Sequence, residues 1–146
     1  MSVNLQKGQK VELKKEGGGT LRRVMVGLGW DEVKRTRGLF APKPQDIDCD
    51  ASAFLCAGGK LLGPDDVVYF GNLQHRSGAV RHMGDNLTGA GEGDDEQIFV
   101  QLADLPQQYD KIVFVVNIYQ AAQRHQDFGM IQNAFIRICD AETNRE

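Results

Sequence analysis

The sequence lacks the features that mark membrane-spanning and secreted proteins. No apolar run approaches the roughly 18 residues of a membrane-spanning helix, and residues 1–7 lack the apolar segment of a signal peptide. Only three cysteines occur among the 146 residues, an odd number without the spacing of a disulfide framework. Because free thiols are typical of reducing compartments, we expect a cytoplasmic protein without a membrane span.

Sustained helical periodicity is also missing from the sequence. Short apolar stretches instead alternate with polar residues between turns that contain glycine and proline, which is the pattern of β-strands. The expected strands are Ser2–Leu5, Lys10–Lys14, Leu21–Trp30, Asp46–Ala57, Val67–Phe70, Ala79–Met83, Gln97–Leu102, Lys111–Tyr119 and Ala134–Cys139, with one helical turn at Ala121–Gln126. We therefore predict an all-β fold, a sandwich of two mostly antiparallel sheets that forms one domain over residues 1–146.

Basic residues are absent from the middle of the chain. No Lys or Arg occurs from His82 to Asp110, whereas residues 1–37 carry nine of the 17 basic residues. We expect those nine to line a solvated strand face. The net charge of −3 excludes the strongly basic proteins that bind nucleic acid through many phosphate contacts, so no nucleic-acid partner is expected.

The most acidic stretch runs from Gly84 to Glu96 and combines five carboxylates with four glycines. Glycine allows the backbone to curl tightly, so several oxygen atoms can point at one spot. Ca²⁺ accepts about six to eight oxygen ligands and would remove the repulsion among the carboxylates. The stretch therefore predicts a calcium-binding loop, with a solvated acidic turn as the alternative.

This loop departs from the EF-hand pattern. Asp85 to Glu96 spans twelve positions with the expected first and last residues. However, Leu87 and Ala90 occupy positions at which the EF-hand has an oxygen ligand and a glycine. Because the residues after Glu96 alternate like a strand rather than a helix, we expect a calcium site of another kind.

A second acidic segment begins at Asp46 and places Asp48 and Asp50 at alternate positions. In a strand these three carboxylates share one face, while Ile47 and Cys49 share the other. Like charges at this spacing repel one another, so either solvent surrounds them or a cation lies among them. We favour the cation, because a sandwich can bring this segment beside the acidic loop.

These two acidic segments resemble signature segments of the TerD tellurite-resistance family. Three further blocks of the sequence also resemble that family and follow in the same order, namely Val26–Asp31, Lys111–Phe114 and Phe128–Arg137. The resemblance runs from Ser2 to about Asp140 and implies a calcium-binding β-sandwich of two sheets. It also implies a bacterial role in tellurite resistance and the response to chemical stress, through protein partners and without an established catalytic activity.

The resemblance further implies a set of metal ligands drawn from three parts of the sequence. These are Asp31, Asp46, Asp48, Asp85, Asn86, Glu92, Asp94, Asp95 and Glu96. It also implies further C-terminal strands, which this chain of 146 residues would lack. Whether another chain supplies those strands or the sandwich is smaller stays open, as does the oligomeric state.

Other types of site find little support in the sequence. His75, His82 and His125 lack the ligand spacing of a transition-metal site. Cys49 and Cys56 are seven positions apart and would face opposite sides of a strand, which argues against a thiol site that reduces tellurite. No nucleophile elbow surrounds any of the serines.

Three functions are compatible with a metal centre built from these residues. The first is a calcium-binding module that acts by binding or scaffolding in a stress-response complex, and this is the function we favour. The second is a metal-dependent hydrolase, in which the ion held by Asp and Glu activates water. The third is a calcium-dependent receptor for a small ligand. An open coordination position beside a pocket would favour the second function over the first.

Overall fold

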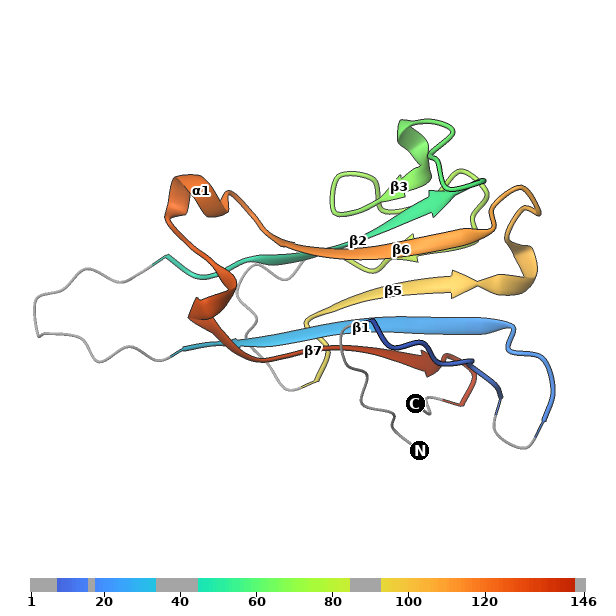
Figure 1. Ribbon diagram of the computed structural model, residues 1–146, viewed down its shortest axis with the longest axis horizontal. Coiled ribbons are helices and arrows are strands. Elements are labelled where there is room, and N and C mark those ends of the chain that lie inside the picture. Colours follow the sequence, from blue (N-terminus) through green and yellow to red (C-terminus); the bar gives the residue numbers. More distant parts are fainter. Residues whose placement is uncertain (1–7, 16–17, 34–44, 85–92, 144–146) are drawn as a thin grey trace, which may run out of the picture.

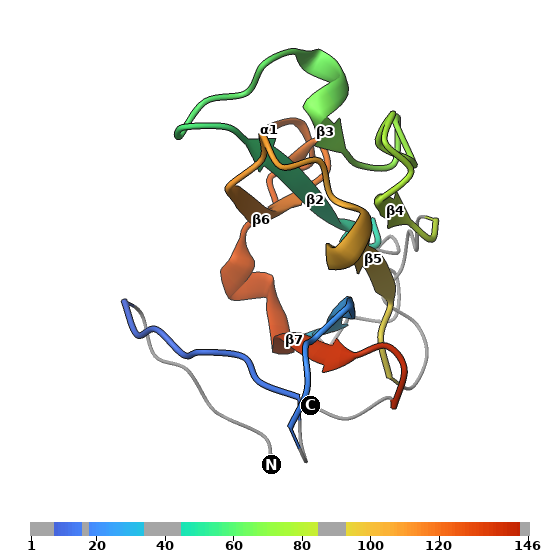
Figure 2. The same ribbon diagram turned by 90° about the vertical axis from the view of Figure 1, so that its right-hand side faces the viewer.

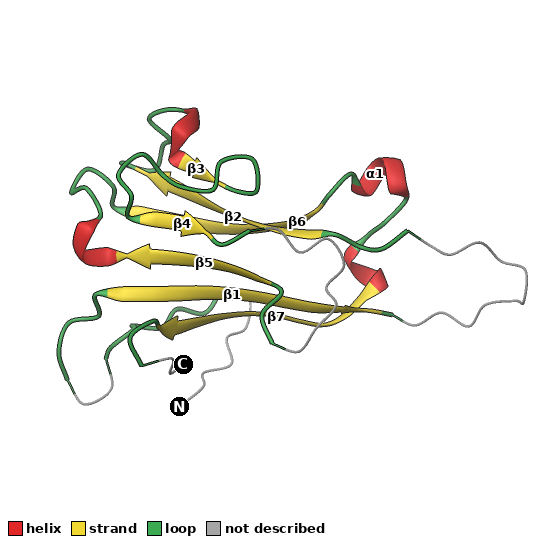
Figure 3. Ribbon diagram, turned by 180° about the vertical axis from the view of Figure 1, so that it is seen from behind, coloured by secondary structure: helices red, strands yellow, loops and turns green. Residues whose placement is uncertain are grey.

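The computed structural model describes residues 8–15, 18–33, 45–84 and 93–143. The strands form two sheets, ordered β4-β5-β1-β7 and β3-β2-β6, that lie one above the other (Figure 1). Neighbouring strands are antiparallel in every described pair. Seen from behind, the described helix is confined to short turns that connect strands (Figure 3). The prediction of an all-β sandwich of two antiparallel sheets is confirmed.

The two sheets differ in size, and short helical turns join their strands. The four-stranded sheet contains β4 (Val80–His82), β5 (Glu96–Gln101), β1 (Arg23–Glu32) and β7 (Ile131–Asp140). The three-stranded sheet contains β3 (Val67–Val68), β2 (Cys49–Cys56) and β6 (Lys111–Ile118). The helical turns are η1 (Pro64–Asp66), η2 (Leu102–Asp104), α1 (Ala121–Arg124) and η3 (Phe128–Met130). The helical turn expected after Lys111–Tyr119 is therefore present as α1.

The core lies between the sheets because apolar side chains alternate along the strands. Leu28 and Trp30 of β1 belong to the same buried cluster as Leu55 of β2 and Ile98 of β5. Burial of such apolar surface stabilises the fold by roughly 25 cal/mol per Å². Trp30 also donates a hydrogen bond from Nε1 to the carbonyl oxygen of Ile47, at 3.1 Å. This contact fixes the end of β1 beside the segment that leads into β2.

The sequence overestimated the number of strands in the N-terminal part of the chain. Lys10–Lys14 alternates as expected, but the structure assigns no strand to it, and Val11 and Leu13 are 44% and 48% exposed. A strand requires a partner edge as well as alternation, and no described strand pairs with this segment. The predicted strand Ser2–Leu5 lies outside the described residues.

One side of the sandwich is covered less completely than the rest. Among the described residues β6 pairs only with β2, and β7 pairs only with β1. These two edge strands lie on the same side of the sandwich (Figure 2). Ile136 and Ile138 of β7 pair with the buried Leu28 and Val26, yet they are 51% and 38% exposed. An apolar cavity of about 260 Å³, lined in part by Phe114 and Ile138, opens between the sheets here.

A buried carboxylate network holds the loop after β3 against the core. Asp66 and His75 are 0% and 1% exposed. The Asp66 carboxylate accepts hydrogen bonds from the Leu62 N–H (2.7 Å), the Gly63 N–H (3.0 Å), the Tyr109 hydroxyl (2.6 Å), the Arg76 guanidinium (3.1 Å) and the His75 Nε2 (3.3 Å). Burial alone would raise the pKa of Asp66, but the hydrogen bonds from Tyr109, Leu62, His75 and Gly63 outweigh it and lower this pKa to about 2.

We expect Asp66→Asn to reduce the free energy of unfolding by about 3 kcal/mol at neutral pH, because donors around the carboxylate lose their charged acceptor. The pKa of Asp66 is lower in the folded protein than in the unfolded chain. The ionised carboxylate therefore stabilises the fold above about pH 4, and this contribution is lost as the pH falls towards 2. Urea unfolding of both proteins at pH 7 and pH 3 measures this, and Asp66→Asn should lose less stability between the two pH values.

The matched control is Asp65→Asn, because Asp65 is the exposed neighbour of Asp66 in the same helical turn. Equal urea midpoints for the two variants at pH 7 would contradict a stabilising role for the Asp66 network.

Candidate functional site

The acidic segments predicted from the sequence meet where β1 ends and where β2 and β5 begin. The Asp95 N–H donates to the Leu28 carbonyl at 2.7 Å, and the Trp30 N–H donates to Asp95 Oδ2 at 2.9 Å. The next residue, Glu96, accepts a hydrogen bond from the Ala51 N–H of β2 through Oε2, at 2.7 Å. Asp95 and Glu96 thereby connect the start of β5 to both sheets.

Within the described part of the chain, Asp48 and Glu96 each supply a buried oxygen without a hydrogen-bond partner, and the neighbouring His82 Nε2 and Arg124 Nε are buried without one as well. Asp48 is 5% exposed and Glu96 is 2% exposed. Asp48 Oδ1 and Glu96 Oε1 are both buried without a hydrogen-bond partner among the described residues. A buried acceptor without a partner costs about 1–3 kcal/mol, and more when it is charged. The two oxygens therefore favour a positively charged group beside them.

The pKa values show that carboxylates crowd one another here. Burial raises the pKa of Asp48; nearby Arg124 partly opposes this shift, and Glu96 adds to it. Burial also raises the pKa of Asp95. The hydrogen bond from the Trp30 N–H partly opposes this shift, and the charges of Asp31, Asp94 and Glu96 add to it. Carboxylates that raise one another's pKa are close enough to repel, which is the electrostatic condition that a bound cation relieves.

Cys49 lies among the same carboxylates. Burial raises the pKa of its thiol to about 12, with contributions from Asp48, Asp50, Glu96 and Asp95. The thiol therefore stays protonated at neutral pH, and the thiolate that reacts with soft oxyanions or metals is strongly disfavoured. The three cysteines of the chain are buried and form no disulfide.

Two basic side chains border the acidic centre, and sequence reasoning missed both of them. His82 Nδ1 accepts a hydrogen bond from the Gly84 N–H at 3.1 Å, and His82 Nε2 lies 3.4 Å from Glu96 Oε2. Arg124 lies over the ring of Tyr119, at 5.1 Å from its centroid, and lowers the pKa of Asp48. The alternation of Val80 and His82 in β4 was the available signal that His82 points into the core.

Asp94 is held differently from its neighbours. Its carboxylate accepts hydrogen bonds from Arg137 Nε (2.7 Å), the Arg137 terminal guanidinium nitrogen (2.9 Å) and Gln97 (3.0 Å). Gly27 makes room for it, since a Cβ atom at that position would lie 2.4 Å from the Asp94 carboxyl carbon. A bidentate guanidinium already neutralises this carboxylate, so Asp94 is less suited than Asp48 to bind a second cation.

The remaining predicted ligands fall into two groups. Asp46 is half-buried, whereas Asp31 is exposed and accepts a hydrogen bond from Asn133 at 2.8 Å. The other three, Asp85, Asn86 and Glu92, lie outside the described residues. Within the described part of the chain, no group of three or more His, Cys, Asp or Glu side chains is arranged to hold a metal ion.

Asp50 is 2% exposed and accepts a hydrogen bond from Asn117 at 3.1 Å, so the alternative that solvent surrounds this carboxylate is wrong, whereas the favoured cation stays a prediction. The reason is that both faces of β2 are buried in the sandwich. Alternation along one strand therefore indicated which residues share a face, without indicating that both faces are covered.

Ser77, His75 and Asp66 have the residue types of a hydrolytic triad, but their turn is built for structure. Ser77 Oγ lies 2.7 Å from His75 Nδ1, which also accepts from the Ser77 N–H. The Gly78 N–H donates to the His75 carbonyl, and the Ala79 N–H donates to Ser77 Oγ. These three consecutive N–H groups are thus engaged inside the turn rather than directed at an oxyanion.

No helix among the described residues is long and apolar enough to cross a membrane.

Known proteins similar to this chain come from stress-response and tellurium-resistance systems. The stress response protein SCP2 of Bacillus subtilis (strain 168) is 50% identical over 150 residues, which cover 100% of this chain and 75% of that protein. The tellurium resistance protein TerD of Serratia marcescens is 45% identical over 147 residues, covering 100% of this chain and 72% of that protein.

Solved structures support the same fold. A homologue of telluride resistance protein (TerD) from Streptomyces coelicolor A3(2) matches with a TM-score of 0.64 over 84% of this chain and 68% of that one, at 22% identity. The sequence of residues 1–146 matches the family model of the TerD domain. This chain therefore belongs to the TerD family of tellurium-resistance and stress-response proteins.

Proposed function

We propose that this protein binds Ca²⁺ through its acidic centre and acts by binding or scaffolding in a cytoplasmic response to tellurium or chemical stress. The observation that carries the proposal is the pair of buried carboxylate oxygens without a partner, Asp48 Oδ1 and Glu96 Oε1. Two further acids, Asp50 and Asp95, lie close enough to contribute to the raised pKa of Cys49. The names of its relatives support the physiological setting.

The chemistry of the donors supports a hard cation. The centre offers carboxylate oxygens, whereas its thiol, Cys49, is held protonated by its surroundings. Oxygen donors suit Ca²⁺ and Mg²⁺, and soft metals prefer thiolate or imidazole. Ca²⁺ is favoured over Mg²⁺ because it tolerates irregular geometry and loses its water ligands more readily. A bound ion would supply positive charge at the point where Asp48 and Glu96 converge.

The protein side chains have separable tasks in this proposal. Asp48 and Glu96 bind the ion, and Asp31, Asp46 and Asp95 add negative charge around it. Asp85, Asn86 and Glu92 are proposed as ligands on the sequence resemblance alone. Asp94 belongs to the same proposed set of ligands. Because it is paired with Arg137, it contributes less to calcium binding than Asp48 does.

Calorimetric titration tests the ion and its ligands. We expect Ca²⁺ to bind more tightly than Mg²⁺, and Asp48→Asn to weaken calcium binding at least tenfold, because it replaces a charged oxygen ligand with a neutral one. Asp94→Asn should weaken binding less, since Arg137 already neutralises that carboxylate. Asp104→Asn is the matched control at an exposed acid outside the centre.

Absence of binding at millimolar Ca²⁺, or the same affinity in Asp48→Asn as in the Asp104→Asn control, would refute the proposal. A metal-dependent hydrolase or a small-ligand receptor would instead require turnover or a ligand that the calcium-loaded protein alone recognises.

Thermal melts test the link between the ion and the fold. Ca²⁺ at about 100 times its Kd should add about 2.7 kcal/mol of stability by preferential binding to the folded state. For a domain of this size the Tm should rise by roughly 5–15 °C, and a chelator should reverse the rise. In chelator, Asp48→Asn should melt slightly above the wild-type protein, because it relieves repulsion between Asp48 and Glu96. Identical wild-type melts in calcium and chelator would show that the acidic loop is a solvated turn.

A further inference from the structure

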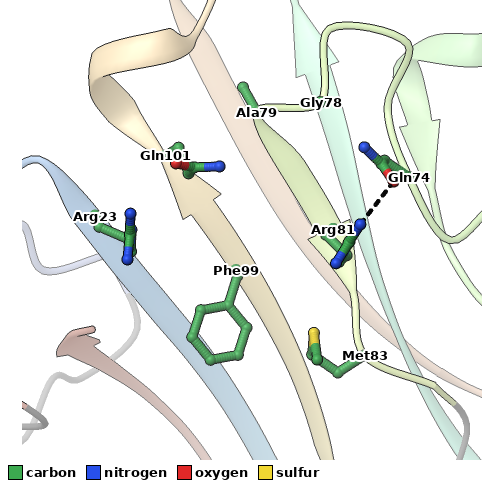
Figure 4. Close-up of a pocket in the computed structure, with 8 residues that line it drawn as sticks. All are labelled: Arg23, Gln74, Gly78, Ala79, Arg81, Met83, Phe99 and Gln101. Atoms are coloured by element: carbon green, nitrogen blue, oxygen red, sulfur yellow. Dashed lines mark hydrogen bonds between the residues drawn. The ribbon is translucent and has the colours of Figure 1, made fainter. Parts of the chain in front are cut away.

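A groove on the outer face of the four-stranded sheet carries positive charge without a described acidic partner. It has a volume of about 440 Å³ and is lined by residues of β1, β4, β5 and the turn before β4 (Figure 4). The lining side chains that matter to the argument are Arg23, Arg81, Gln74, Gln101, Phe99 and Met83. We call this feature the arginine groove.

The strand register explains why these side chains meet. Arg81 of β4 pairs with Phe99 of β5, and Gln101 of β5 pairs with Arg23 of β1. Their neighbours along β4 and β5 are buried in the core, so these side chains point outward by alternation. Figure 4 shows the Phe99 ring between Arg23 and Arg81, with Met83 beside it. The groove thus has an aromatic and thioether floor between two guanidinium groups.

The positive charges of the groove are not neutralised by its own described lining. No Asp or Glu of the described residues lines it. Neither Arg23 nor Arg81 forms an ion pair with a described carboxylate. Arg81 donates one hydrogen bond to Gln74 Oε1 at 3.1 Å, which orients its guanidinium and leaves further N–H groups for a ligand.

We propose that the arginine groove binds an organic phosphate that carries a planar ring, of about the size of a mononucleotide. Two guanidinium groups match the charge and the oxygen geometry of a phosphate dianion. The Phe99 ring supplies a surface on which a planar group stacks, and the amides of Gln74 and Gln101 supply polar contacts at the rim. The volume lies within the roughly 300–1,000 Å³ range of small-molecule sites, much more than a free inorganic anion fills.

This site is separate from the acidic centre. Arg81 and Phe99 point away from the core, whereas on the same strands the buried His82 faces Glu96, and Glu96 accepts the hydrogen bond of the Ala51 N–H. Binding in the groove therefore does not depend on the calcium proposal, and each can fail without the other.

The experiment is a titration of the full chain followed by amide chemical shifts, in chelator, with AMP, adenosine and inorganic phosphate as probes. AMP should bind at least tenfold more tightly than either of the other two, because only AMP carries both the dianion and the ring. Arg23→Gln and Arg81→Gln should each weaken AMP binding by about tenfold to a hundredfold. Phe99→Leu should weaken the binding of AMP and leave the low affinity for inorganic phosphate unchanged.

Arg22→Gln is the matched control, since Arg22 is an exposed arginine that precedes Arg23 and does not line the groove. It should bind AMP as the wild-type protein does. Three results would overturn the proposal: no saturable shifts with AMP, equal affinity for AMP and inorganic phosphate, or the same loss in Arg22→Gln as in Arg81→Gln. Because Arg23 and Arg81 are exposed, each variant should melt as the wild-type protein does, which separates loss of binding from loss of fold.

Discussion

Two neighbouring carboxylates at the start of β5 connect the sheets at the acidic end of the sandwich. Asp95 accepts the Trp30 N–H of one sheet, and Glu96 accepts the Ala51 N–H of the other. Here β3 no longer pairs with β2, so the Ala51 N–H would lack a partner without Glu96. A hydrogen bond to a charged acceptor contributes more than one between neutral groups, but it requires that a negative charge be buried. The carboxylate that connects the two sheets is therefore also one of the charges of the acidic centre.

The sequence predicted the sandwich well, because alternation and turn residues are local signals that survive in the fold. It failed at Lys10–Lys14, where alternation lacked a partner edge, and it did not indicate that both faces of β2 are covered, which rules out a solvated Asp50. The pairing of Asp94 with Arg137 joins residues 43 positions apart, which no local pattern predicts. Asp48, Asp95 and Glu96 lie close enough to act on the pKa of Cys49, but their role as metal ligands stays a prediction. The same holds for Asp85, Asn86 and Glu92, which lie outside the described residues.

The surroundings of Cys49 separate binding from redox chemistry. A thiol attacks or reduces a soft oxyanion as its thiolate, and burial, with a further contribution from the surrounding carboxylates, raises the pKa of Cys49 and opposes that ionisation. Membership of a tellurium-resistance family therefore does not require this cysteine to react with tellurium. The carboxylates that add to this increase are also the hard oxygen donors of the proposed calcium site.

The partly covered side of the sandwich has a practical consequence. Val113 and Val115 of β6 are 41% and 38% exposed, and within the described residues this strand has a partner on one edge only. An apolar strand with a free backbone edge is a template for adding strands from other molecules, and charged residues normally guard against this. Lys111, at the start of β6, is the single charged residue of that strand. Solutions of this polypeptide are therefore expected to aggregate increasingly with concentration, and a lysine in place of Val113 or Val115 would act as a gatekeeper.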